Sequence, residues 1–231
     1  MIDTLLEKNW IPDFLIRSQI RRLNQRRLKS EAQKHANGYK AELVKELKSS
    51  PIAIETIAAN DQHYEVPPEF FERCLGKHLK YSCCYWPNEV SNLDQAESRM
   101  LELTCERADI KDGQTILELG CGWGAISLWM AEHYPNSKIL SVSNSNDQRK
   151  FIEKTAAQRG LQNLQVQTCD MNSFETDQTF DRVVSVEMFE HMKNYDELLR
   201  RINKWLNSEG KLFVHIFSHN KFAYHFETEG E

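Results

Sequence analysis

The periodicity of hydrophobic and polar residues changes near residue 112 of the chain. Beyond that point, short apolar runs alternate with amphipathic segments of helical spacing. The apolar runs predict strands at residues 115–119, 138–142, 164–168, 181–187 and 211–217. The amphipathic segments predict helices at residues 125–133, 147–159 and 195–206. We therefore expect an α/β fold, a doubly wound and mostly parallel sheet whose ligands bind at the carboxyl ends of the strands.

The first 110 residues predict helices instead of strands. One helix begins near Pro12-Asp13, where apolar residues follow at one-face spacing, and a long helix covers residues 93–110. We expect residues 1–110 to form a helical N-terminal cap and residues 111–231 to form the ligand-binding core.

Composition excludes several classes of protein. The 231 residues are 40% hydrophobic and 27% charged, which is typical of a globular chain. No apolar run approaches the ~20 residues that span a bilayer, and no signal-peptide pattern opens the chain. The six cysteines are scattered without a C-x-x-C pair, which argues against a disulfide or zinc framework. We expect a cytoplasmic protein with reduced thiols and no metal site.

Charge is unevenly distributed, because the first fifty residues hold 11 Lys and Arg against 6 Asp and Glu while the whole chain is at -5. The basic residues of the first long helix are Arg17, Arg21, Arg22, Arg26, Arg27 and Lys29. A solvated helical face is the simplest interpretation, and contact with an anionic surface is the alternative. The acidic remainder and the lack of interleaved aromatics argue against nucleic acid as a partner.

A glycine-rich turn follows the first predicted strand. Glu118 leads into Gly120, Gly122 and Gly124 in an E-x-G-x-G-x-G pattern, which differs from the G-x-G-x-x-G of dinucleotide-binding proteins. Alternating glycines let the backbone turn tightly and approach a ligand closely. A plain strand-to-helix turn is the alternative, and three glycines directly after a strand make it the weaker interpretation.

The same pattern resembles motif I of class I, Rossmann-like methyltransferases that use S-adenosyl-L-methionine. The resemblance implies that this loop packs under the methionine part of the cofactor, and that Glu118 orders the loop or reaches the cofactor's amino group. A carboxylate beside the loop suits a cationic sulfonium ligand better than the pyrophosphate of NAD.

Polar residues end the second and third predicted strands. Ser143, Asn144 and Gln148 stand where many methyltransferases hold the ribose with an acid, and this pattern resembles the cyclopropane-fatty-acyl-phospholipid synthase superfamily. Asn144 and Gln148 can both hydrogen-bond ribose hydroxyls. By the same resemblance Asp170 accepts from the adenine amino group and Met171 packs on the ring, although a strand-end Asp by itself is more often a helix cap.

A cluster of ionisable residues follows the fourth predicted strand, after Ser185, which the resemblance adds to the cofactor site. Glu187, Glu190 and His191 lie in E-M-F-E-H, which resembles the signature of the coclaurine N-methyltransferase-like branch. Cyclopropane synthases typically carry glycine in place of Glu187, so this residue favours amine chemistry. An amine is mostly protonated at pH 7, so a carboxylate must attract it and a base must take its proton. A helix N-terminus, where acids are common, is the alternative.

A second segment, Y-S-C-C-Y-W, resembles the same family. The resemblance implies that Tyr81 and Ser82 close over the carboxylate end of the cofactor. In cyclopropane synthases the residues that match Cys83, Glu190 and His215 hold a bicarbonate ion, which removes a proton from the carbocation intermediate. All three are present, so bicarbonate-assisted chemistry stays open, although periodicity alone makes His215 an ordinary strand histidine.

Three functional hypotheses result, and the intact Glu187, Glu190 and His191 argue against one of them, a cofactor-binding module without turnover. The first is methyl transfer from S-adenosyl-L-methionine to a small-molecule amine. The second is methylene transfer to an unsaturated acyl chain of a phospholipid at a membrane surface, where the basic helix would help. The family fold has seven strands and the chain supplies five, so we expect a core without its C-terminal strands. The acceptor is not identified by these patterns, and a homodimer stays open.

Overall fold

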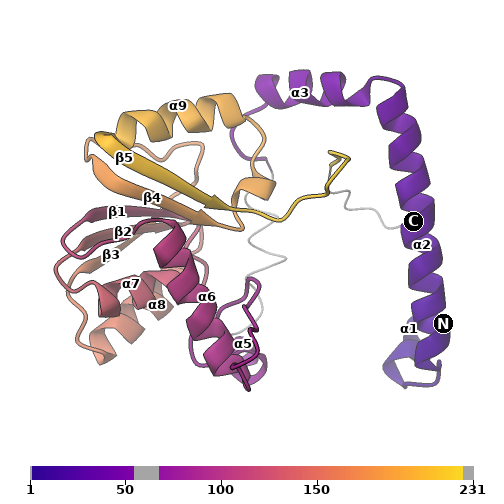
Figure 1. Ribbon diagram of the computed structural model, residues 1–231, viewed down its shortest axis with the longest axis horizontal. Coiled ribbons are helices and arrows are strands. Elements are labelled where there is room, and N and C mark those ends of the chain that lie inside the picture. Colours follow the sequence, from indigo (N-terminus) through magenta and orange to yellow (C-terminus); the bar gives the residue numbers. More distant parts are fainter. Residues whose placement is uncertain (1, 55–67, 226–231) are drawn as a thin grey trace. The chain divides into compact units, whose positions relative to one another are not determined.

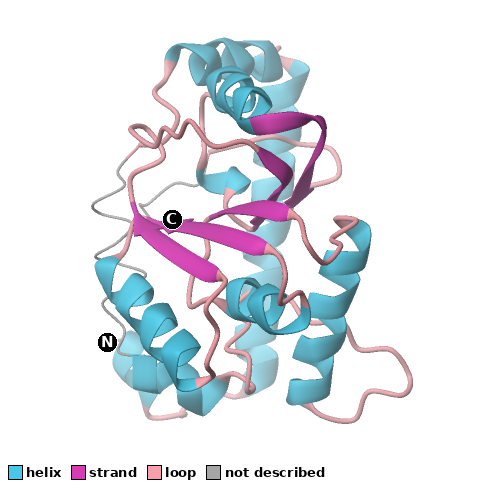
Figure 2. Cartoon of the chain, turned by 90° about the vertical axis from the view of Figure 1, so that its left-hand side faces the viewer, coloured by secondary structure: helices cyan, strands magenta, loops and turns pink. Residues whose placement is uncertain are grey.

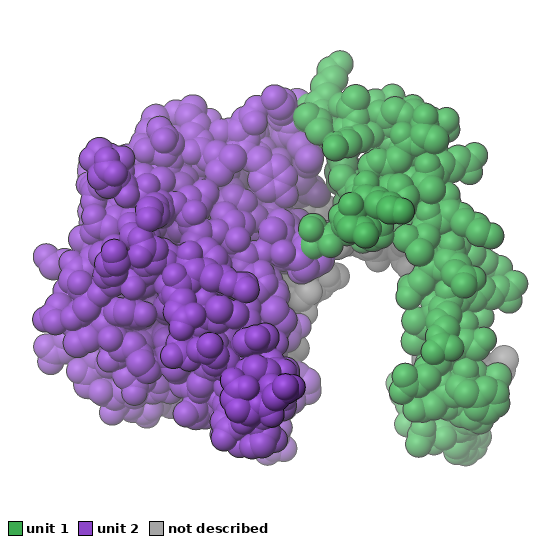
Figure 3. All heavy atoms as spheres, in the orientation of Figure 1, with its two compact units in different colours: residues 1–46, 218–231 green, residues 47–217 purple. Residues whose placement is uncertain are grey.

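The computed structural model describes residues 2–54 and 68–225 (Figure 1). Packing divides the chain into two compact units, residues 1–46 with 218–231 and residues 47–217 (Figure 3). This division differs from the predicted boundary at residue 110, because helix α6 (Leu93–Arg107) packs through Leu101 and Cys105 against the sheet residue Ile116. The boundary at 110 stays a prediction about where the ligand-binding core begins.

A five-stranded parallel sheet forms the centre of the larger unit, in the order β3-β2-β1-β4-β5. The strands are β1 (Thr115–Leu119), β2 (Lys138–Ser143), β3 (Leu164–Thr168), β4 (Phe180–Val186) and β5 (Leu206–His215). The predicted α/β class and parallel sheet are confirmed. The start predicted for β5, residue 211, is wrong: the strand already pairs at Leu206, and the register then shifts between Phe180 and Arg182 of β4. Turn-forming residues such as Asn207 and Gly210 concealed this irregular start.

Helices cover both faces of the sheet, as Figures 1 and 2 show. The covering helices are α6, α7 (Ala125–His133), α8 (Asn146–Gln158) and α9 (Tyr195–Trp205). Successive residues of β1 point to opposite faces, so Leu117 belongs to the same core cluster as Trp205 of α9 while Ile116 belongs to the cluster that contains Met130 of α7. Burial on both faces explains why these strands read as continuous apolar runs.

The smaller unit contains α1 (Ile2–Glu7) and the long polar helix α2 (Asp13–Ala36), and α3 (Tyr39–Ser49) leads into the larger one. Helix α2 buries Glu31, which forms ion pairs with Arg27 at 3.0 Å and Lys34 at 3.2 Å. Its predicted apolar face stays exposed, including Phe14 and Ile20. Within the described ranges, no helix has both the length and the apolar character needed to cross a membrane.

Two short elements complete the frame of the site. Helix α5 (Pro68–Cys74) precedes the Y-S-C-C-Y-W segment, and the 3-10 helix η1 (Phe189–His191) follows β4. The segment that follows α3 reaches the same end of the sheet, because the Ala53 N–H donates to Asn172 Oδ1 at 3.0 Å and Ala53 pairs with Met192.

Candidate active site

A cavity of about 410 Å³ opens at the carboxyl ends of β1, β2 and β4. This is the edge at which ligands collect in parallel sheets. Of the predicted site residues, the following line it: Tyr81, Ser82, Glu118, Gly120, Gly122, Ser143, Asn144, Gln148, Met171, Glu187 and His191. Six others are not part of its lining: Cys83, Gly124, Asp170, Ser185, Glu190 and His215.

The three glycines of the turn after β1 all have positive φ angles, but the space around their Cβ positions differs. A Cβ on Gly120 would lie 2.8 Å from Met188 Cβ, and one on Gly124 would lie 2.6 Å from Ile152 Cγ1. A Cβ on Gly122 would meet no described atom within 4 Å. Gly120 and Gly124 therefore permit close packing, whereas Gly122 faces the open space of the cavity.

Glu118 is a buried acid in the wall of the cavity, with only 2% of its surface exposed. Its Oε2 accepts hydrogen bonds from the hydroxyls of Ser127 and Ser141. Burial raises the pKa of Glu118 to about 7, and the two serines offset only part of that effect. The side chain can therefore change its charge when a cation binds nearby.

The turn after β2 holds an amide donor in the cavity wall. The Ser143 hydroxyl donates to Gln148 Oε1 at 2.6 Å and itself accepts from the Ser145 N–H at 3.0 Å. Gln148 is buried, and its Nε2 meets no hydrogen-bond partner among the described residues. An unsatisfied buried donor indicates that a ligand or water accepts from it.

Two predicted cofactor residues take structural positions. Asp170 Oδ1 accepts from the Asn172 N–H at 2.7 Å within the turn after β3, and no helix begins there for it to cap. The buried Ser185 hydroxyl donates to the Leu119 carbonyl at 3.0 Å and ties β4 to the end of β1. Neither contact assigns a ligand role to these two residues.

Glu187 has a backbone that side chains rarely adopt, with φ at 51°. Its N–H donates to the His215 carbonyl at 2.8 Å, which holds this conformation at the ends of β4 and β5. A left-handed backbone costs energy at a residue other than glycine, and strained residues of this kind cluster at functional sites. The strained turn directs the carboxylate into the cavity.

The other two ionisable residues of E-M-F-E-H occupy different positions relative to the cavity. His191 lines the cavity beside Glu187. Glu190 is buried in η1, where backbone N–H groups of Glu190 itself and Phe217 face its carboxylate, and it does not line the cavity. Burial raises the pKa of Glu190, and the charge of Glu187 adds to that effect.

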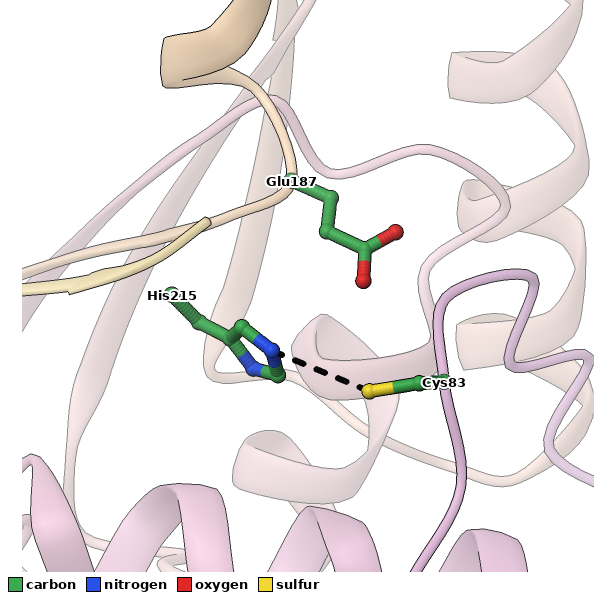
Figure 4. Close-up of side chains that lie close together, drawn as sticks. All are labelled: Cys83, Glu187 and His215. Carbon is green, nitrogen blue, oxygen red and sulfur yellow. Dashed lines mark hydrogen bonds between the residues drawn. The ribbon is translucent and has the colours of Figure 1, made fainter. Parts of the chain in front are cut away.

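Cys83, Glu187 and His215 form a cluster at one side of the cavity (Figure 4). The Cys83 Sγ and His215 Nε2 atoms lie 3.7 Å apart, and one Glu187 oxygen lies within 4.8 Å of both. Burial lowers the pKa of His215, although the charge of Glu187 opposes this shift. The lowered pKa favours a neutral imidazole. The resemblance grouped Cys83 and His215 with Glu190, but Glu187 is the carboxylate that joins them here.

Lys80 is a cavity residue that the sequence patterns missed. It is 3% exposed, and its ammonium donates to the Ser82 hydroxyl. Burial lowers the pKa of Lys80, while nearby groups that include Cys83 and Glu187 oppose the shift. Its place directly before Y-S-C-C-Y-W was the available signal, because a lysine inside an aromatic-rich segment is rarely buried without a partner.

Comparison with known proteins adds a family to this geometry. Residues 53–229 match the family model described as mycolic acid cyclopropane synthetase. (S)-coclaurine N-methyltransferase of Thalictrum flavum subsp. glaucum is 44% identical over 98% of this chain and 63% of its own length. Cyclopropane-fatty-acyl-phospholipid synthase of Escherichia coli strain K12 is 34% identical over 69% of this chain and 41% of its own length.

Among solved structures, coclaurine N-methyltransferase bound to N-methylheliamine and SAH superposes with a TM-score of 0.89 at 40% identity, over 97% of this chain and 65% of that one. This chain thus spans somewhat less than two thirds of the length of these two coclaurine N-methyltransferases. The family model covers most of the chain and the sheet carries the fold of these relatives. The chain therefore belongs to the mycolic acid cyclopropane synthetase family, in its coclaurine N-methyltransferase-like branch.

Proposed function

We propose that the protein transfers the methyl group of S-adenosyl-L-methionine to the nitrogen of a small-molecule amine. The observation that carries the proposal is Glu187, a carboxylate that a strained backbone directs into the cavity beside the glycine turn. The related structure bound to N-methylheliamine and SAH supports both the methyl donor and the amine acceptor of this proposal.

The cavity residues fit S-adenosyl-L-methionine. Gly122 leaves room for a ligand to approach the backbone, and the unsatisfied Gln148 amide is a donor for a ribose hydroxyl. Met171 provides apolar surface for the adenine ring. Glu118 suits the cationic methionine end, and the Lys80 ammonium with the Ser82 hydroxyl suits its carboxylate. When bound, this cofactor supplies an electrophilic methyl group on a sulfonium.

The chain's own residues then prepare the amine. Glu187 attracts the ammonium form into the cavity, and a base must take its proton before the nitrogen lone pair can attack. Glu187 is the first acceptor in this proposal, and the imidazoles of His191 and His215 are the groups that pass the proton on. Holding nitrogen, methyl carbon and sulfur in line provides much of the remaining acceleration.

Radiolabelled S-adenosyl-L-methionine distinguishes the outcomes directly. We expect label in a methylated amine when the protein is incubated with coclaurine and a panel of other small amines. Vesicles of unsaturated phospholipid are included in a parallel reaction. Label that appears only in the lipid fraction would contradict the proposal.

One observation keeps that lipid reaction as a second candidate. Cys83 and His215 are two of the three residues implied for a bicarbonate site, and they lie 3.7 Å apart. The cyclopropane-fatty-acyl-phospholipid synthase of Escherichia coli, to which the chain is similar, also supports methylene transfer to a lipid. The absence of Glu190 from the cluster, and the presence of Glu187 in it, favours the amine.

The pKa of about 7 at Glu118 predicts how cofactor binding depends on pH. A cationic ligand favours the ionised carboxylate, so below pH 7 binding must also remove the Glu118 proton. We expect the affinity for S-adenosyl-L-methionine to rise about fivefold to tenfold between pH 6 and 7.5 and then to level off. Calorimetry at several pH values measures this, and Glu118→Gln should show a flat profile. An equally steep profile in that variant would assign the titration to another group.

A further inference from the structure

We propose that Cys83, Glu187 and His215 form a binding site for a thiophilic divalent cation such as Zn²⁺, and that the bound metal inhibits the enzyme. The sequence predicted no metal site, because its six cysteines are scattered without a C-x-x-C pair. Metal binding is independent of the proposed function, whereas the inhibition rests on it.

The spacing of the donor atoms fits a tetrahedral metal. Bonds of about 2.3 Å to sulfur and about 2.0 Å to nitrogen, at a tetrahedral angle, separate the two ligand atoms by about 3.5 Å. The Cys83 Sγ and His215 Nε2 atoms are 3.7 Å apart, and a Glu187 oxygen is within 4.8 Å of each. Small side-chain rotations would therefore bring all three atoms into one coordination sphere (Figure 4).

The backbone holds two of the ligands in place. Glu187 follows β4 and His215 ends the neighbouring strand β5, and the Glu187 N–H donates to the His215 carbonyl at 2.8 Å. The left-handed backbone of Glu187 fixes the direction of its side chain. Cys83 approaches from the separate segment before α6 and is exposed, so an ion from solvent can reach the site.

The donor types select the class of metal. A thiolate, an imidazole and a carboxylate suit Zn²⁺, whereas Mg²⁺ and Ca²⁺ prefer oxygen ligands alone. Binding would release the Cys83 thiol proton to solvent and leave one position open to water. The nearby Lys80 ammonium competes with the cation, so we expect weaker binding than at structural sites with four protein ligands.

The consequence for the proposed reaction follows from Glu187. A carboxylate that coordinates a metal is no longer available to attract an ammonium ion. Zinc should therefore inhibit amine methylation, and a chelator should restore it.

The test is titration of the untagged protein with Zn²⁺ alone, followed by calorimetry, with Co²⁺ as a spectroscopic probe. We expect one Zn²⁺ per chain and a thiolate-to-cobalt charge-transfer band. Cys83→Ser and His215→Gln should each weaken zinc binding at least tenfold, and Cys83→Ser should abolish the band. Cys84→Ser is the matched control, because it removes the adjacent thiol, which lies outside the cluster. Circular dichroism confirms that each variant is folded.

Equal zinc binding by Cys83→Ser and the unmodified protein would overturn the site, as would the absence of saturable binding. Inhibition is measured separately, on whichever amine the protein methylates. If zinc binds but leaves methylation unchanged, the inhibitory role is wrong. If no amine is methylated, the proposed function fails while the calorimetry still decides whether the site exists.

Discussion

Replacement of Glu187 by glutamine is expected to lower kcat for amine methylation by about 10²- to 10⁴-fold, which is the range for loss of a positioned acid–base group. Glutamine keeps the size of the side chain and can occupy the same strained backbone, so the fold should be unaffected. It removes the charge that attracts the ammonium and the group that first accepts its proton. The affinity for S-adenosyl-L-methionine, measured by calorimetry, should stay within about twofold.

Steady-state kinetics at saturating amine separates the two tasks of Glu187. A rise in KM with unchanged kcat would mean that the carboxylate only binds the ammonium, and would remove the base from the mechanism. Glu209→Gln is the matched control, because Glu209 is exposed in β5 and does not line the cavity. Its kinetic constants should equal those of the unmodified protein.

Substitution of Gly122 by alanine is expected to weaken cofactor binding by about tenfold to a hundredfold. The added methyl group would occupy the open space beside the turn after β1, where the ligand must approach the backbone. The positive φ of 52° adds strain of about 1 kcal/mol, which lowers the free energy of unfolding as well.

Gly160→Ala separates these two effects. Gly160 also has a positive φ and open space around its Cβ position, but it does not line the cavity. Both variants should lose similar stability in urea-induced unfolding, and only Gly122→Ala should lose cofactor affinity in calorimetry. Equal affinities in the two variants would show that the turn after β1 does not contact the cofactor.

Local patterns predicted most of the fold because both faces of the sheet are buried. Strands β1 and β3 have the predicted bounds, and β2 and β4 differ by one residue at one or both ends. The start of β5 was missed because its pairing with β4 is irregular, and no local pattern encodes that pairing. Likewise, the one-face pattern predicted for α2 is wrong, because its apolar residues spread around the helix, and Phe14 and Ile20 stay exposed.

The candidate site was predictable where its residues lie on one turn of the chain. Glycines after a strand predicted the turn of the cavity, and Glu187 and His191 line that cavity as the E-M-F-E-H pattern indicated. Glu190 belongs to the same pattern but points into the protein, since the short helix η1 rotates it away from its neighbours. Lys80 lies directly before the Y-S-C-C-Y-W segment, but only the tertiary structure shows that it is buried in the cavity wall.

By itself, then, the sequence determined the α/β class, the glycine turn and the family. Each of these follows from a motif of consecutive residues or from the regular spacing of apolar residues. Only the tertiary structure decided which carboxylate stands beside Cys83 and His215, which lie 132 residues apart in the chain. That choice depends on the pairing of β4 with β5 and on the left-handed backbone of Glu187. Both arise from contacts between segments that are distant in the chain. Such contacts produce no regular spacing of residues from which they could be predicted.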